Sequence, residues 1–225
     1  MKTHLSALLV AGSIVMPAQA ALIHQYDLNG SFADSFGGPA LVGGGGVLGP
    51  AGYSFGVGQG LSLPNPGVGA SYRIELVFNL DIICNAKYCK LVDFQNLASD
   101  NGLYTAPNNA LNLYNVALGS TAVGNTPVTV AITRDAGGAF NAYLNGALEF
   151  TIADDTGVGN VSNNILWFFQ DEGQQGNNPG EYASGFVDSI RIFDTPAGNP
   201  VPEPAALLLS ATGILALLAV RRRPT

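Results

Sequence analysis

The stretch Ala-Phe-Asn-Ala-Tyr-Leu-Asn-Gly-Ala-Leu-Glu-Phe-Thr-Ile, residues 139–152, decides the fold class. Its two halves alternate between apolar and polar side chains, which is typical of strands with one buried face. Between them, Asn145-Gly146 supplies two residues that tolerate a positive φ, as a two-residue hairpin turn requires. The stretch therefore predicts two antiparallel strands, 139–144 and 147–152, joined in a β-hairpin.

Similar patterns lie on both sides of this hairpin. Residues 71–78 and 128–133 alternate, and the second segment is rich in β-branched side chains. Residues 164–170, which include Trp167, hold a continuous apolar run that predicts a central strand buried on both faces, and residues 185–194 predict a closing strand. No segment of residues 21–200 shows a sustained helical period with a cap. We therefore predict an all-β fold, an antiparallel two-sheet β-sandwich of about a dozen strands.

Composition excludes several classes of function. The chain has 9 Lys and Arg residues against 16 Asp and Glu residues, and only 11% of its residues are charged. Nucleic-acid binding needs clustered basic side chains to neutralise phosphates, so we expect no nucleic-acid partner. Residues 21–200, one domain by length, carry five basic side chains against fifteen acidic ones. Such a surface repels anionic polymers and favours cations.

The first 20 residues are typical of a secretory signal peptide. Lys2 precedes an apolar run over residues 5–16, and Ala18-Gln19-Ala20 places small residues at the two recognition positions. We therefore predict cleavage between Ala20 and Ala21 and export of the remaining chain.

Residues 201–225 form a separate C-terminal segment with a Pro-rich triplet, an uncharged apolar run and an arginine cluster. These parts are Pro202-Glu203-Pro204, residues 205–220, and Arg221, Arg222 and Arg223. The apolar run spans about 24 Å as a helix, against a hydrocarbon core of roughly 30 Å, so by length alone it is a marginal transmembrane helix. The arginines place its C-terminal end in the cytoplasm and the preceding chain outside, in agreement with the signal peptide.

This order of parts resembles a PEP-CTERM sorting signal, found on exported proteins of Gram-negative bacteria that make extracellular polysaccharide. The resemblance implies one partner, exosortase, a membrane-embedded cysteine protease that cleaves near the Pro-Glu-Pro triplet. We therefore expect export across the inner membrane, a transient inner-membrane anchor, and then a location at the cell surface or outside the cell. A plain C-terminal anchor after a Pro-rich linker is the alternative, and it differs only in the fate of the tail.

Residues 22–195 resemble the laminin G-like, concanavalin A-like lectin superfamily. The likeness is carried by Thr133-Arg134-Asp135 with the Tyr143-Leu144-Asn145-Gly146 hairpin, and by the closing strand with Asp188 and Arg191. It implies a jelly roll used for carbohydrate binding, adhesion or, in some branches, glycoside hydrolysis, so fold alone leaves function undecided. In the closing strand we expect a buried Asp188, held by Arg191 or by loop amides in a structural role.

Residues 170–181 hold the side chains best suited to a metal site. They offer three carboxylates and several amide side chains, hard oxygen donors of which calcium binds six to eight. Members of the resembled family often bind calcium near loops of this kind. We therefore expect Asp171 and Glu181 to be calcium ligands, with Asn177 and Asn178 behind them. A solvated surface loop without a metal is the alternative.

The two cysteines, Cys84 and Cys89, enclose four residues between predicted strands. In the oxidising compartment that the signal peptide implies, they predict a disulfide that closes a short loop. A redox pair would usually have C-x-x-C spacing and a thiol near a helix N-terminus, and neither feature is visible.

The sequence contains no catalytic motif, so we predict that the protein is not an enzyme. A glycosidase needs two carboxylates about 5 to 10 Å apart. The candidates are Glu75, Glu149, Glu172 and Glu181, but the closely spaced Glu-x-Asp-x-x-Glu strand motif of laminarinase-like relatives is absent. His24 is expected to be an edge-strand residue, because no Gly-x-Ser-x-Gly elbow accompanies it.

Together these features predict an exported surface or extracellular-matrix protein, associated with exopolysaccharide or biofilm. Its lectin-like domain would bind carbohydrate or other matrix components with the help of calcium. The alternative is a secreted polysaccharide hydrolase of the concanavalin A-like superfamily.

Overall fold

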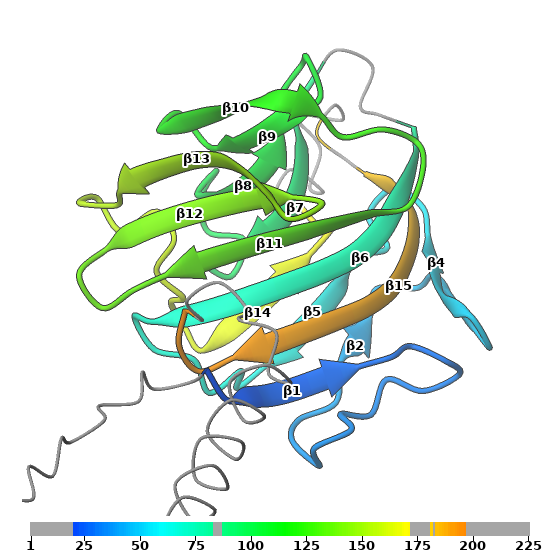
Figure 1. Ribbon diagram of the computed structural model, residues 1–225. Helices are drawn as coiled ribbons and strands as arrows, with labels where there is room; N and C mark the ends of the chain where they lie inside the picture. The colour runs from blue at the N-terminus through cyan, green and yellow to red at the C-terminus, as the bar shows by residue number, and fades with distance from the viewer. Residues whose placement is uncertain (1–19, 83–86, 172–180, 182, 197–225) are drawn as a thin grey trace, which may run out of the picture.

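The computed structural model describes residues 20–82, 87–171, 181 and 183–196, and their strands form two antiparallel sheets packed face to face (Figure 1). The eight-stranded sheet contains β1 (Leu22–Tyr26), β3 (Val47–Gly49), β4 (Gly52–Phe55), β6 (Tyr72–Ile82), β11 (Val128–Arg134), β12 (Ala139–Leu144), β13 (Ala147–Ala153) and β15 (Ser184–Phe193). The seven-stranded sheet contains β2 (Val42–Gly43), β5 (Leu61–Pro64), β7 (Cys89–Asp93), β8 (Gly102–Thr105), β9 (Ala110–Leu113), β10 (Ala117–Ala122) and β14 (Ile165–Phe168).

The strand order explains how distant parts of the chain meet. In the larger sheet the order is β13-β12-β11-β6-β15-β4-β3, and β1 pairs with β15. In the smaller sheet it is β10-β9-β8-β7-β14-β5-β2. The described residues contain strands, turns and loops but no helix. The predicted all-β, antiparallel two-sheet sandwich is therefore confirmed.

The hairpin that decided the fold class forms as predicted. β12 and β13 pair in antiparallel register, and the turn residues Asn145 and Gly146 have φ values of 51° and 82°. Within β12, Phe140, Ala142 and Leu144 are buried while the residues between them are half-buried. In β12 the alternation read from the sequence thus corresponds to one face turned toward the core, whereas in β13 Phe150 and Ile152 are half-buried and Leu148 is exposed.

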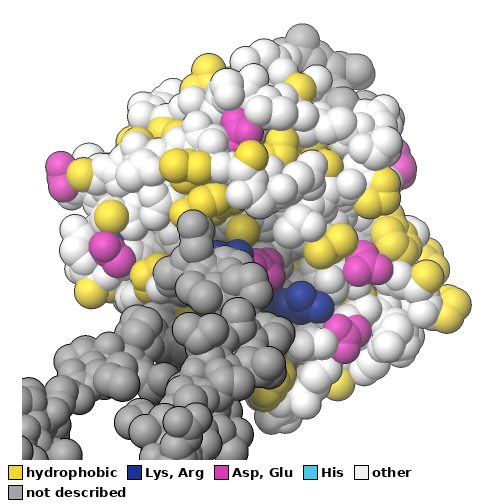
Figure 2. All heavy atoms as spheres, in the orientation of Figure 1, with side chains coloured by type: hydrophobic (Ala, Val, Ile, Leu, Met, Phe, Trp, Pro, Cys, Tyr) yellow, Lys and Arg dark blue, Asp and Glu magenta, His cyan; other side chains and the backbone are white. Residues whose placement is uncertain are grey.

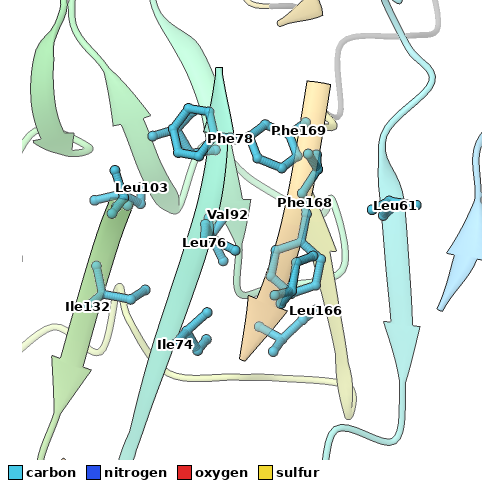
Figure 3. Close-up of a cluster of buried hydrophobic side chains, with 14 of the residues drawn as sticks. Leu61, Ile74, Leu76, Phe78, Val92, Leu103, Ile132, Leu166, Phe168 and Phe169 are labelled. Carbon is cyan, nitrogen blue, oxygen red and sulfur yellow. The ribbon is translucent and has the colours of Figure 1, made fainter. Parts of the chain in front are cut away.

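The core lies between the two sheets and is filled by alternate side chains from both (Figure 3). Leu76 and Phe78 enter it from β6, while Leu103 on β8 and Phe168 on β14 enter it from the opposite sheet. Burial of apolar surface between two inner faces is the main force that stabilises such a sandwich. The described residues contain no helix long and apolar enough to cross a membrane. Most of the predicted signal peptide and the whole predicted helix 205–220 lie outside the described residues.

The apolar run of residues 164–170 forms β14, which lies between β5 and β7 as a central strand should. The prediction that it is buried on both faces is wrong. Leu166 and Phe168 are buried, but Ile165 and Trp167 are only half-buried, on the outer face of the sheet. Phe169 then leaves the strand with a φ of 57° and is also buried in the core. The run is continuous because it combines a strand with one face in the core and a turn that returns to the core.

The predicted burial of Asp188 in the closing strand is also wrong. β15 changes register between Val187 and Ser189, which is the irregularity of a β-bulge. Val187, Ile190 and Ile192 remain buried, whereas Asp188 and Arg191 are exposed. Neither side chain therefore needs the other to satisfy a buried charge.

Candidate functional site

Aromatic and charged side chains share the outer face of the seven-stranded sheet. Trp167 on β14 pairs in register with Asp93 on β7, and Lys90 on β7 pairs with Tyr104 on β8. Cross-strand partners point to the same side of a sheet. Because Leu166 and Leu103, the neighbours of Trp167 and Tyr104 along their strands, enter the core, all four side chains lie on the face turned away from it.

Lys90 is the buried centre of this face. Its Nζ lies 3.0 Å from Asp93 Oδ2, 3.2 Å from Asp171 Oδ1 and 5.1 Å from the centroid of the Tyr104 ring. It also donates a hydrogen bond to Ser99 O at 3.2 Å. The Lys90 side chain is fully buried, and both carboxylates are almost fully buried. A lysine without solvent needs such partners, because an unpaired buried charge is strongly destabilising.

Two of the predicted calcium ligands converge on this lysine. Asp171 contacts Lys90 through the ion pair, and the Glu181 carbonyl accepts a hydrogen bond from the Lys90 backbone N at 3.4 Å. Asn177 and Asn178 lie outside the described residues. Within the part of the chain that the structure describes, no group of three His, Cys, Asp or Glu side chains could hold a metal ion. The described residues alone do not form a calcium site, so calcium binding stays a prediction that depends on residues 172–180.

Three tyrosines cluster beside Lys90. The Tyr104 ring centroid lies 6.0 Å from that of Tyr88 and 5.4 Å from that of Tyr114, and the last two lie 5.9 Å apart. Tyr104 is buried, while Tyr88 and Tyr114 are half-buried. Burial raises the pKa of Tyr114, and the nearby Asp100 carboxylate raises it further. The Tyr114 hydroxyl therefore stays protonated at neutral pH and able to donate a hydrogen bond.

Trp167 is held by a strained loop. Its indole Nε1 donates a hydrogen bond to Asn96 Oδ1 at 3.0 Å. Asn96 and Leu97 have φ values of 54° and 56°, a region that a leucine rarely adopts. Asp93 Oδ1 accepts hydrogen bonds from the backbone N atoms of Gln95 at 3.0 Å and Leu97 at 2.8 Å, which fixes this conformation. The indole ring is thus held in one orientation while remaining half-exposed.

The same loop, residues 94–101, connects both aromatic groups. It contacts Trp167 at Asn96 and Tyr114 at Asp100. We call Tyr88, Asn96, Asp100, Tyr114 and Trp167 the aromatic band. Its rings offer apolar surface, and its amide and carboxylate offer hydrogen-bonding groups beside that surface. The burial pattern predicted from the sequence misses this band, because residues 164–170 predict a fully buried Trp167.

Glu75 and Glu149, two of the candidate carboxylates for hydrolysis, lie on different strands and each is engaged by other groups. Glu75 on β6 contacts Arg73, with Oε1 2.6 Å from Nη2. Glu149 lies on β13, with β11 and β12 between it and β6. Its Oε2 accepts hydrogen bonds from the backbone N atoms of Ser120 at 2.8 Å and Thr121 at 2.9 Å, which joins β13 to β10 of the other sheet. Glu172 lies outside the described residues.

His24 lies on β1 but is buried, in contact with a carboxylate that sequence reasoning missed. Its Nδ1 lies 2.8 Å from Asp34 Oδ2 and its Nε2 lies 2.9 Å from the Pro66 carbonyl. Both ring nitrogens are therefore engaged by acceptors, and neither faces a nucleophile. This pair holds β1 against two loops.

Cys89 begins β7, is fully buried and is not a free thiol. Cys84 lies outside the described residues. The Cys84–Cys89 disulfide therefore stays a prediction.

The outer face of the eight-stranded sheet differs from the aromatic band. Figure 2 shows hydrophobic, acidic and basic side chains interspersed over this face. Tyr143 on β12 is half-buried here and pairs in register with Ala131. It provides an aromatic side chain of similar exposure on the opposite side of the sandwich.

Comparison with known proteins identifies the C-terminal segment and the fold. Residues 200–223 match the PEP-CTERM protein-sorting motif. No curated protein matches the chain by sequence. Among solved structures, domain 4 of the extracellular arabinanase AbnA from Geobacillus stearothermophilus, in complex with arabinotriose, superposes with a TM-score of 0.58 and 16% identity. That match covers 80% of this chain and 96% of the arabinanase domain.

Two further matches belong to longer proteins. Trypanosoma rangeli sialidase superposes with a TM-score of 0.60 and 14% identity. That match covers 79% of this chain and 31% of the sialidase chain. A botulinum neurotoxin type C structure, from work on cell entry that depends on two ganglioside molecules, superposes with a TM-score of 0.59 and 14% identity. That match covers 80% of this chain and 49% of the neurotoxin chain. At such identities the likeness shows the fold. The chain is an antiparallel two-sheet β-sandwich that carries a PEP-CTERM sorting motif at residues 200–223.

Proposed function

We propose that this chain is an exported, exosortase-processed protein of the cell surface or extracellular matrix, and that its sandwich binds carbohydrate through the aromatic band. The observation that carries the proposal is the presence of half-exposed Trp167 and Tyr114 on one outer sheet face, joined by a single loop. The sorting motif supports the location, since it matches the segment expected to direct export and processing.

The chemistry of the band suits sugars. Binding sites for small polar ligands combine aromatic surface with a few placed polar groups. The faces of Trp167 and Tyr114 offer apolar area to the C–H face of a sugar ring. Asn96 and Asp100, beside these rings, can bind hydroxyl groups. Trp167 needs little ordering on binding, because the loop already holds its indole.

The charge of the domain narrows the kind of glycan. Residues 21–200 carry five basic and fifteen acidic side chains, and Lys90 is already held between two carboxylates. Acidic polysaccharides would meet repulsion at this surface. We therefore propose a neutral polysaccharide as the ligand. One structural neighbour supports this proposal, because the arabinanase domain is in complex with arabinotriose, a neutral oligosaccharide.

Binding to immobilised arabinan and to exopolysaccharide from the producing cells tests the proposal. Trp167→Ala and Tyr114→Ala each remove one ring, and we expect each to weaken binding by about tenfold, on the order of 1.4 kcal/mol. Tyr143→Ala on the opposite sheet is the matched control and should bind like the wild type. The binding is measured in calcium and in EDTA, which tests the calcium prediction for residues 170–181 at the same time.

Equal binding by all three variants would contradict the placement of the site, and no binding by the wild type to either polysaccharide would contradict the function. Denaturant unfolding of each variant shows whether lost binding reflects lost structure. A polysaccharide hydrolase is the alternative function. It is less well supported, because Glu75 and Glu149 are separated by two strands and each is engaged by other groups. Release of reducing sugar from the same polysaccharides would favour it.

A further inference from the structure

The start of β1 and the end of β15 meet through a reciprocal pair of hydrogen bonds. The backbone N of Ala21 donates to Asp194 Oδ1 at 2.9 Å, and the backbone N of Asp194 donates to Ala21 O at 3.1 Å. Figure 1 shows the beginning of β1 beside the arrowhead of β15. Both residues are exposed. Ala21 is also the residue that follows the predicted signal-peptide cleavage site.

Cleavage at this site changes the chemistry of the Ala21 nitrogen. In the precursor it is a neutral amide that donates one N–H. Hydrolysis breaks the Ala20–Ala21 peptide bond, adds the oxygen of water to the Ala20 carbonyl carbon, and leaves a primary amine on Ala21. An α-amino group has a pKa of about 7.7 to 8.0, so at neutral pH it takes up a proton and becomes an ammonium group. The hydrogen bond to Asp194 then joins a cation to an anion, which strengthens it.

We infer that removal of the signal peptide creates an ion pair between the Ala21 α-ammonium and the Asp194 carboxylate, and that this pair fastens β1 to β15 only in the mature protein. Asp194 is placed to accept the new charge without rearrangement, since its Oδ1 already lies 2.9 Å from the nitrogen. The nearby Thr195 hydroxyl donates to the same oxygen at 3.2 Å and helps to orient it.

The other charged side chains near this end of the sandwich have partners other than Asp194 or lie away from it. On β6, Arg73 pairs with Glu75, and on β1 the His24 ring contacts Asp34. Arg191 on β15 pairs in register with Gln25 rather than with Ala21.

The position of the pair gives it a consequence for maturation. Among the described strands, β1 pairs with β15 alone, so its outer edge has no neighbouring strand to hold it. The pair lies at the first residue of the mature chain and six positions before the sorting motif begins. Signal-peptide removal thus adds an ion pair between the start of β1 and the end of β15, at the end of the domain where the sorting segment begins.

The test uses the exported protein, with intact mass establishing its first residue. The α-amine is acetylated selectively near neutral pH, where lysines are protected by their much higher pKa. Unfolding by urea is then compared for wild type and Asp194→Asn, each with a free and with an acetylated amine. Because both partners are exposed, we expect Asp194→Asn to lower the folding equilibrium constant by up to about fivefold with the free amine and by clearly less after acetylation.

Asp188→Asn is the matched control, since it removes an exposed carboxylate of β15 that does not contact Ala21, and it should behave alike in both backgrounds. An equal effect of Asp194→Asn with free and acetylated amine would overturn the inference, as would a mature chain that starts at another residue. A second readout does not depend on stability. The wild-type α-amine should react with acetic anhydride several-fold more slowly than that of Asp194→Asn, and equal rates would also overturn the inference.

Discussion

Single buried charges set the shape of the candidate site. Lys90 lies beneath the tyrosine cluster, between Asp93 and Asp171. Asp93 in turn holds the loop that positions Trp167. One ammonium group therefore connects the tyrosine cluster, the loop of residues 94–101 and the end of β14. The aromatic band thus depends on buried side chains outside the band itself.

Replacement of the Lys90 ammonium group should strongly lower the stability of the fold. Lys90→Met keeps most of the volume but leaves two carboxylates buried without a counter-charge, which costs about 3 to 5 kcal/mol of the free energy of unfolding. Urea denaturation measures the change. The combined variant Lys90→Met, Asp93→Asn, Asp171→Asn should recover part of the loss, because it removes the uncompensated charges. Lys87→Met is the control at an exposed lysine nearby and should change stability by less than about 0.5 kcal/mol. Similar stability of the two single variants would contradict this account.

Asp34 is expected to make the free energy of unfolding depend on pH in the acidic range. Burial alone would raise the pKa of Asp34, but hydrogen bonds from the His24 ring and from the backbone N atoms of Gln25, Phe36 and Gly38 outweigh it and lower the pKa below its ordinary value. A carboxylate with a lowered pKa in the folded state stabilises the fold above its unfolded pKa of about 3.9, and this stabilisation is lost as pH falls through the folded pKa.

The wild-type urea midpoint should therefore fall more steeply between pH 5 and pH 3 than that of Asp34→Asn. The gap between the two proteins should be widest above pH 5 and should narrow on acidification. Asp188→Asn, at an exposed carboxylate, should follow the wild-type curve. Parallel curves for wild type and Asp34→Asn would show that the hydrogen bonds to Asp34 do not hold its charge in the folded state.

At the scale of elements, strands follow from local sequence and the site does not. The β12–β13 hairpin is predictable because its alternation and its Asn145-Gly146 turn are contiguous. The exposure of Trp167 is not predictable in this way, because it depends on which face of β14 the eight-stranded sheet covers. The partners of Lys90 illustrate the same limit: Asp93 lies three positions away, but Asp171 comes from a distant segment. A lysine inside the apolar stretch of residues 89–92 was the one local signal of a buried charge.

Three strands, β4, β15 and β6, approach closely at Gly185. Gly185 on β15 lies between β4 and β6, and a Cβ there would overlap the carbonyl of Asn79 and lie 3.0 Å from Leu80 Cα. Backbone atoms cannot yield as a flexible side chain does, so Gly185→Ala should destabilise the fold by about 1 to 3 kcal/mol in urea unfolding. Gly69→Ala is the control, since its Cβ would meet nothing within 4 Å. A Gly185 variant as stable as the Gly69 variant would mean that the strands separate freely at this point.

For the whole molecule, the two ends of the chain carry the information on location. The sandwich is flanked by a predicted signal peptide and by the matched sorting motif at residues 200–223. The order of parts in that motif was readable because it is contiguous. The ligand was not readable, because a jelly-roll sandwich serves many functions and its sites are assembled from distant strands.

Loss of the triplet should leave the chain unprocessed. Changing Pro202, Glu203 and Pro204 to alanine removes the expected recognition element, so we expect the protein to accumulate in the inner-membrane fraction with its C-terminal tail attached. Intact mass and cell fractionation measure both effects. Pro196→Ala, outside the motif, should be processed normally. Wild-type mass and location for the triple variant would contradict processing at this motif.

The Glu149 contact bears on how this sandwich avoids pairing with other copies of itself. The free edge of a sheet offers backbone N–H groups to any passing strand, and crowded edges of this kind lead to aggregation. In β10, at the edge of the seven-stranded sheet, the N–H groups of Ser120 and Thr121 are occupied by the Glu149 carboxylate from the other sheet. A single acidic side chain thus occupies two backbone donors at this edge, and it disfavours pairing of β10 with a strand from another molecule.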